Sequence, residues 1–230
     1  MPSPLNEIQV CYEFSNGAYT RRRGLRVCHL DFAFSSALPR DFVLDGKRKI
    51  CICLYSQPPS LDHAGRVIEG MDYGFVGGVS LLSYGPFNFE RYKVADDLVR
   101  DEMVLSTIEN SLAAVAREFG SEERPIHEAA ASIRRSAYEY ECETGLSRST
   151  KDRRIRVHVF VKFGRAGLTW RAEVRSRNGD LLGEESILKK GSYFDIAADY
   201  RKSSIDGRTF KLFDWNEKRR ITIDLKRYAA

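Results

Sequence analysis

The chain has 230 residues, of which 43% are hydrophobic, 11% aromatic and 30% charged, and its formal net charge is +5. The aromatic content exceeds what disordered segments carry, and no fixed period recurs that would indicate a solenoid, a collagen or a coiled coil. A chain of this length buries roughly 70% of the surface that it exposes when unfolded. We therefore expect a globular protein with a sizeable core.

The first third of the chain predicts strands. Residues 7–14 alternate between apolar and polar side chains, and residues 47–55 place Ile and Leu on one face and Cys and Tyr on the other; both patterns have the two-residue period of a strand. Residues 24–34 are interpreted as a further strand. Residues 66–84 are also extended in character, but glycines at four positions indicate a bulged or bent path.

The middle of the chain predicts two helices. Apolar residues keep helical spacing over residues 94–119, acidic residues gather where this helix begins, and Gly120 is a suitable stop. A second helix is predicted over residues 122–142, with Pro125 tolerated in its first turn and Gly145 ending it.

The last third returns to strands. Residues 154–163 alternate strictly and pair with residues 168–174 in a predicted hairpin, and residues 209–215 and 218–225 form a second one. Residues between the two hairpins have no clear period, and a short helix at 193–200 is one interpretation of them.

This order of elements predicts an α+β fold. A mainly antiparallel β-sheet formed by the N- and C-terminal β-rich segments, residues 1–87 and 151–228, would pack against the central pair of helices in residues 90–144. No linker rich in Pro, Gly or Ser divides the chain, so residues 1–230 are expected to form a single domain. An internal boundary is conceivable near residues 146–153.

The sequence favours a soluble cytoplasmic protein with reduced thiols. The N-terminus has neither a basic segment nor an apolar run typical of a secretory signal, and no apolar stretch approaches the length of about 20 residues that spans a bilayer. Cys51 and Cys53 project from the same face of a predicted strand. They suggest a redox or metal pair, although buried thiols that pack as small hydrophobic groups explain them more simply.

No short motif predicts catalysis, and neither a metal nor a cofactor is expected. The sequence lacks the common phosphate-binding, dinucleotide-binding, zinc-protease and serine-hydrolase motifs. His29 and Asp31 resemble a general base and its orienting acid on one strand face. Asp195 and Asp199, joined by Asp206 or Asp214, could hold a divalent ion. In both cases solvated polar side chains are the simpler interpretation.

Two further groups of residues are candidates for binding. Basic side chains in the last third could form a face suited to a phosphate backbone, although acidic residues are interspersed among them. The basic residues of this face are Arg153, Arg154, Arg156, Lys162, Arg171 and Arg175. The segment before the long helix is rich in aromatic residues, which either fill the core or contact a partner. The candidate contact residues are the aromatic Tyr84, Phe87, Phe89 and Tyr92, together with Arg91.

Three classes of function follow, and the distribution of charge ranks them. Residues 1–60, 61–125 and 126–230 carry net charges of +3, −6 and +8, a segregation that serves recognition more than folding. The leading hypothesis is a non-enzymatic protein that binds one specific protein partner, for example a toxin-neutralising inhibitor of the immunity type. The alternatives are a metal-dependent or His-dependent enzyme with dispersed site residues, and a nucleic-acid-binding module.

Overall fold

The computed structural model describes residues 2–12, 28–56, 66–190, 200–214 and 216–228. The chain divides into two compact units, Met1–Tyr140 and Glu141–Ala230, so the division lies a few residues before the expected boundary region. Helices and strands are both present and most strand pairs are antiparallel, which confirms the α+β class. The β-rich N- and C-terminal segments form separate sheets. A single domain over residues 1–230 stays a prediction.

The N-terminal unit contains a five-stranded sheet with strand order β1-β2-β5-β4-β3. Its strands are β1 (Glu7–Tyr12), β2 (Lys49–Leu54), β3 (Arg66–Ile68), β4 (Met71–Val76) and β5 (Val79–Tyr84). The bent path predicted over residues 66–84 consists of the last three strands. Gly70 and the pair Gly77-Gly78 form the turns between them, with φ angles of 81°, 57° and 82° that favour glycine.

The strand predicted over residues 24–34 is wrong. Residues Cys28–Ala37 form helix α1, which connects β1 to its parallel neighbour β2. β2 and β5 are also parallel, so this sheet is mixed. Parallel neighbours need a crossover connection, and α1 supplies it. Leu30, Ala33 and Phe34 are fully buried, and their spacing is the helical signal that the short strand interpretation missed.

The long helix was predicted correctly in its centre and less well at its start. The helix predicted over residues 94–119 corresponds to α3 (Asp97–Phe119), and a separate short helix, α2 (Phe89–Val94), precedes it. The side chain of Asp96 accepts a hydrogen bond of 2.8 Å from the Val99 amide and caps α3. Gly120 ends α3 in the left-handed conformation, as expected. Leu98 is 52% exposed, so the buried stripe of α3 begins a turn later than predicted.

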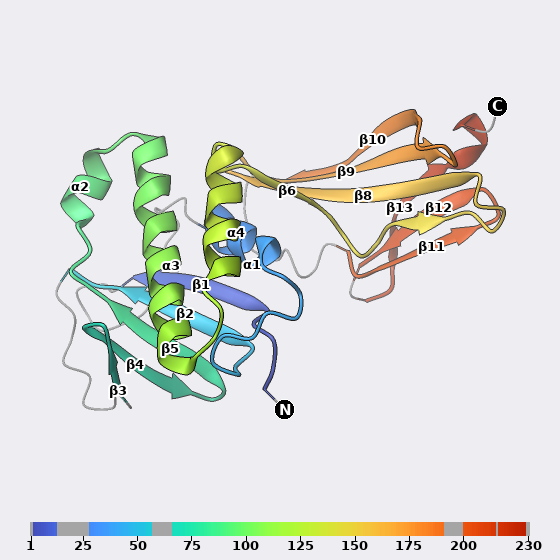
Figure 1. The fold of residues 1–230 in the computed structure, drawn as a ribbon. Helices are drawn as coiled ribbons and strands as arrows, with labels where there is room; N and C mark the ends of the chain where they lie inside the picture. Colours follow the sequence, from blue (N-terminus) through green and yellow to red (C-terminus); the bar gives the residue numbers. More distant parts are fainter. Residues whose placement is uncertain (1, 13–27, 57–65, 191–199, 215, 229–230) are drawn as a thin grey trace. The chain divides into compact units, whose positions relative to one another are not determined.

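The second predicted helix is shorter than expected. α4 (Arg124–Arg135) ends before Ala137 and Tyr138, which both have positive φ angles, and Tyr140–Glu143 forms strand β6. Figure 1 shows α1, α3 and α4 over one face of the five-stranded sheet. The core of this unit therefore lies between that face, which contributes Ile50, Ile52 and Leu82, and the helices.

Side chains of α1 bind the outer edge of β1. The Ile8 amide donates to Ser35 Oγ at 3.0 Å, and the Val10 amide donates to Asp31 Oδ2 at 3.1 Å. Among the described strands β1 lies at one end of the sheet, so none of them pairs with these donors on that side. Asp31 and Ser35 are one helical turn apart, which lets them serve two alternate residues of the strand.

The C-terminal unit contains the remaining strands in two sheets. One sheet has the order β10-β9-β8-β6, with β7 also paired to β8, and the other has the order β11-β12-β13. The strands are β7 (Arg148–Ser149), β8 (Ile155–Gly164), β9 (Gly167–Ser176), β10 (Leu181–Lys190), β11 (Lys202–Asp206), β12 (Thr209–Phe213) and β13 (Arg219–Asp224).

Both predicted hairpins of the C-terminal unit are confirmed, as β8–β9 and β12–β13. In β8, Val157, Val159 and Val161 are buried, and Phe210 and Leu212 of β12 are fully buried. Residues 193–199 of the short helix suggested above lie outside the described residues.

Candidate functional site

The aromatic segment lies between β5 and α3, and two of its members are core residues. Phe87 and Tyr92 are 6% and 5% exposed, and their ring centroids are 5.9 Å apart. Burial raises the pKa of Tyr92 to about 12. Tyr84 and Phe89 are half-buried, and Arg91 is the one exposed residue of the five. The core-filling interpretation therefore describes Phe87 and Tyr92, and this segment offers little apolar surface to a partner.

His29 and Asp31 do not form the pair suggested by the sequence. Because they lie two residues apart on helix α1, their side chains point in different directions. His29 Nε2 lies 3.4 Å from Asp101 Oδ1 of α3, whereas Asp31 binds the Val10 amide. His29 and Asp101 are 1% and 3% exposed, so neither offers surface to a substrate. Their contact connects α1 to α3 inside the core.

The structure gives no support to the carboxylate metal site that was weighed above as an alternative. Asp195 and Asp199 lie outside the described residues. Asp206 is exposed and pairs with Lys211 at 2.8 Å, and Asp214 is 1% exposed and accepts hydrogen bonds from the amides of a tight turn. Among the residues that the structure describes, no group of three or more His, Cys, Asp or Glu side chains is arranged to hold a metal ion.

Four of the six predicted basic-face residues lie on β8 and β9, among acidic neighbours. Arg171 lies 2.6 Å from Glu141 and also pairs with Glu173 and Glu184. Arg175 lies 2.7 Å from Glu173. The hydrogen bond from Arg171 is the main cause that lowers the pKa of Glu173. This part of the sheet is therefore a mixed-charge surface.

Glu141 and Glu143 also belong to that surface, which could not be foreseen because no strand was predicted over residues 140–143, most of which were assigned to a helix. In strand β6 these two side chains lie beside β8. Glu143 contacts His158 at 2.9 Å and Arg156 at 3.7 Å. The position of Lys162 in β8 adds one further cation to the sheet.

The remaining two basic-face residues, Arg153 and Arg154, lie in the turn between β7 and β8, beside a hollow. This hollow has a volume of about 670 Å³ and is named the basic cavity below. Its walls come from the β7–β8 turn, the start of β10, the β11–β12 turn and the C-terminal helical turn. They comprise Ser149, Thr150, Lys151, Asp152, Arg154, Ile155, Ser176, Leu182, Ile205, Gly207, Arg208 and Tyr228.

The charge of the basic cavity is positive because its cations outnumber its carboxylates. Lys151, Arg154 and Arg208 line it together with one acidic residue, Asp152. Asp152 accepts a hydrogen bond of 2.6 Å from the Thr150 hydroxyl, which is the main cause that lowers the pKa of this carboxyl group. No ion pair to Lys151 or Arg208 is found within the described ranges. Lys151 lies close enough to Asp206 to contribute, after Lys211, to lowering the pKa of that carboxyl group, so Arg208 is the more available of the two cations for an anionic ligand.

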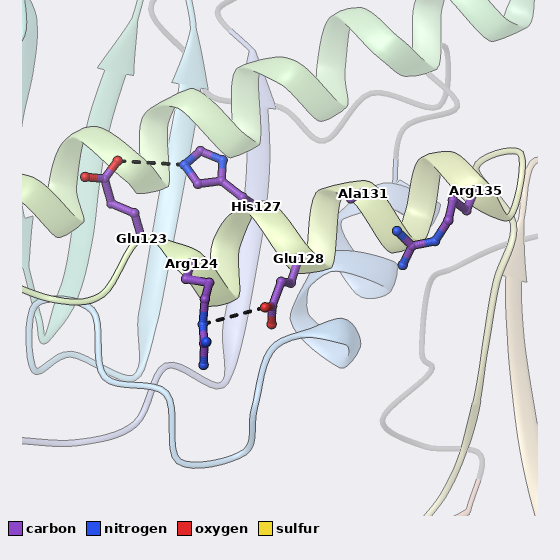
Figure 2. Close-up of a pocket in the computed structure, with 6 residues that line it drawn as sticks. All are labelled: Glu123, Arg124, His127, Glu128, Ala131 and Arg135. Carbon is purple, nitrogen blue, oxygen red and sulfur yellow. Dashed lines mark ion pairs between the residues drawn. The ribbon is translucent and has the colours of Figure 1, made fainter.

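A second hollow, of about 590 Å³, lies along the exposed side of α4 (Figure 2). Its charges are balanced: His127 contacts Glu123 at 3.8 Å, and Arg124 contacts Glu128 at 3.6 Å. Figure 2 shows these pairs along a single helix, with Arg135 further along it. A charge-balanced helix surface is a weaker candidate for ligand binding than the basic cavity.

The negative charge of residues 61–125 does not form an open acidic face on α3. Glu102 binds Arg134 of α4 at 2.8 Å and accepts hydrogen bonds from Ser106 and Tyr138. Partial burial raises the pKa of Glu102, but these three hydrogen bonds outweigh it and bring the pKa to about 2. Glu109 is likewise held by Arg134 at 2.8 Å. Part of the negative charge counted along this segment is thus paired in the fold.

Comparisons with protein families, curated proteins and solved structures found no match to this chain. Within the described residues, no helix has the length and apolar character that a membrane crossing requires.

Proposed function

We propose that the protein is a binding protein that recognises an acidic protein partner through the basic cavity of its C-terminal unit. The observation that carries this proposal is the contrast between two sets of cations in the same unit. Arg171 and Arg175 are paired with carboxylates on the sheet face, whereas Lys151 and Arg208 line a hollow without such partners within the described ranges.

The lining of the basic cavity favours an acidic protein segment over a nucleic acid. Ile155, Leu182 and Ile205 supply apolar walls next to the cations, a combination that suits a carboxylate side chain flanked by aliphatic neighbours. A nucleic acid is better held by a continuous basic groove with exposed rings for stacking. The outward ring of Phe160 is covered instead by the Arg171 guanidinium, 4.4 Å from its centroid.

A toxin-neutralising inhibitor is one form that such a binding protein could take, and together with a cytoplasmic location it stays a prediction. An enzymatic function has less support, because His29 is buried against Asp101, and Asp206 and Asp214, the described members of the candidate metal site, are engaged in structural contacts.

Fluorescence anisotropy with two labelled probes of equal charge tests the proposal. One probe is a peptide of alternating glutamate and leucine, and the other is a thymidine oligonucleotide. We expect the peptide to bind more tightly, with an affinity that falls as salt screens the charges. The double variant Lys151→Glu with Arg208→Glu should weaken peptide binding by about tenfold or more, since charge reversal in the contact region replaces attraction by repulsion.

The matched control is Lys189→Glu with Lys218→Glu. It changes the net charge equally, at exposed positions that do not line the basic cavity, and should weaken binding by no more than about twofold. Tighter binding of the oligonucleotide would favour the nucleic-acid module instead. No binding of either probe at low salt, or equal losses in both double variants, would overturn the proposal.

A further inference from the structure

Three cysteines of the N-terminal unit converge on one face of its sheet. Cys11 lies on β1 directly beside Cys53 of β2, and Cys51 is two residues earlier on the same strand. All three are buried, at 6%, 5% and 9% exposure, in a cluster with Tyr55. The sequence predicted the shared face of Cys51 and Cys53, whereas the addition of Cys11 depends on the parallel pairing of β1 with β2.

The thiols of Cys11 and Cys51 are already in contact. Their Sγ atoms are 3.2 Å apart, so an approach of about 1.2 Å would bring them to the length of a disulfide bond. In the register of the two strands, Cys51 lies diagonally from Cys11, because the direct neighbour of Cys11 is Cys53. Diagonal neighbours have Cα atoms roughly 7–8 Å apart, which is at or just beyond the upper limit of the separations that disulfides bridge. Bond formation therefore requires the backbones of β1 and β2 to move locally towards each other along this diagonal, in addition to the approach of the two sulfur atoms.

We propose that Cys11 and Cys51 are an oxidation site, at which a small disulfide oxidant converts the two thiols into an intramolecular disulfide. One cysteine sulfur attacks the oxidant and displaces its first thiol, which leaves a mixed disulfide. The other cysteine sulfur then attacks the mixed disulfide and displaces the second thiol. The two cysteines lose two electrons and two protons, and the protons end on the two released thiols. This site is independent of the basic cavity and of the function proposed for it.

The surroundings of the site make the reaction slow at neutral pH. The hydrogen-bonded contact with Cys11, together with burial, raises the pKa of Cys51 to about 12. Since the thiolate is the reactive form, little of it is present at pH 7, and its fraction rises about tenfold for each unit of pH below that pKa. The oxidation rate should therefore increase from pH 7 to pH 9.

The test uses the full-length protein under native conditions, reduced and then incubated with oxidised glutathione at pH 8.5. After an acid quench, remaining thiols are alkylated and the protein is digested without reductant for mass spectrometry. We expect a monomer in which two thiols resist alkylation and a peptide pair links Cys11 to Cys51. Cys142→Ser is the control variant and should leave this link intact, because Cys142 lies in the C-terminal unit.

Cys51→Ala should abolish the link. If that variant folds poorly, the disulfide-linked peptides identified in the wild-type protein still support or refute the site. A wild-type protein in which Cys11 and Cys51 remain unlinked would overturn the proposal, whether its thiols stay reduced, pair with other cysteines or join two chains.

Discussion

The hydrogen bond from Asp31 to the edge of β1 leads to a specific stability prediction. Asp31→Ala removes the acceptor of the Val10 amide, and Val10 is 3% exposed, so water cannot easily replace that acceptor. An unsatisfied buried donor costs about 1–3 kcal/mol, and hydrogen bonds to charged groups lie in the upper part of that range. We expect Asp31→Ala to lower the free energy of unfolding by about 2–3 kcal/mol.

Two further variants separate the hydrogen bond from the charge. Asp31→Asn keeps an acceptor oxygen and should cost about 1 kcal/mol or less, while Ser35→Ala removes the neutral acceptor of the Ile8 amide at 3.0 Å and should cost about 1 kcal/mol. Urea unfolding followed by circular dichroism gives the free energies. Amide hydrogen exchange gives the location, because Asp31→Ala should accelerate exchange at Val10 more than at Ile8.

The free energy of unfolding of Asp31→Ala could instead lie within about 0.5 kcal/mol of the wild-type value, a change typical of surface substitutions. That result would show that water or a backbone shift satisfies the Val10 amide. So would unchanged exchange at Val10. Either result would refute the role assigned to Asp31.

Three other predictions concern the ion pairs and the core. Because the pKa of Glu102 is lowered to about 2, the ionised carboxylate stabilises the fold above pH 4.5, and this stabilisation is lost as the pH falls towards 2. Since the side chain is 40% exposed, we expect it to contribute about 1 kcal/mol to the free energy of unfolding. Glu102→Gln should therefore flatten the pH dependence of urea unfolding between pH 4.5 and 2. Leu112→Ala, at a fully buried position, should cost about 2–5 kcal/mol in thermal or urea unfolding, whereas Leu98→Ala at a 52% exposed position should cost under about 0.5 kcal/mol. Arg171→Met should cost about 1–3 kcal/mol of unfolding free energy, because it leaves the 8% exposed Glu173 with one partner fewer. Arg156→Met should have little effect, because Arg156 lies 3.7 Å from Glu143. Equal losses in these two variants would contradict the importance given to the shorter contacts.

Elements with strong local patterns were predictable from the sequence. Strict alternation identified the β8–β9 hairpin, and Gly120 identified the end of α3. In these segments the side-chain pattern and the turn or cap residues agree with the tertiary structure, so local information is sufficient.

Elements that depend on distant partners were not predictable in this way. The ten residues of α1 also fit a short strand, and what distinguishes them is the crossover between parallel β1 and β2. The same holds for the candidate sites. The contact between His29 and Asp101 spans 72 positions, and the basic cavity joins Lys151 to Arg208 across several turns. Such groups meet in space, and no spacing along one segment reveals them.

The carboxylates between the arginines of β8 and β9 have a consequence for the behaviour of the protein in a crowded solution. The last 105 residues carry a net charge of +8, and a surface with that much positive charge would ordinarily adhere to RNA and other polyanions. Glu141, Glu143 and Glu173 are already counted in that net charge, and they lie between the arginines of this sheet, so the excess positive charge lies elsewhere on the unit. Adsorption of polyanions to this sheet face is thereby limited, and the cations of the basic cavity belong to the positive excess that remains.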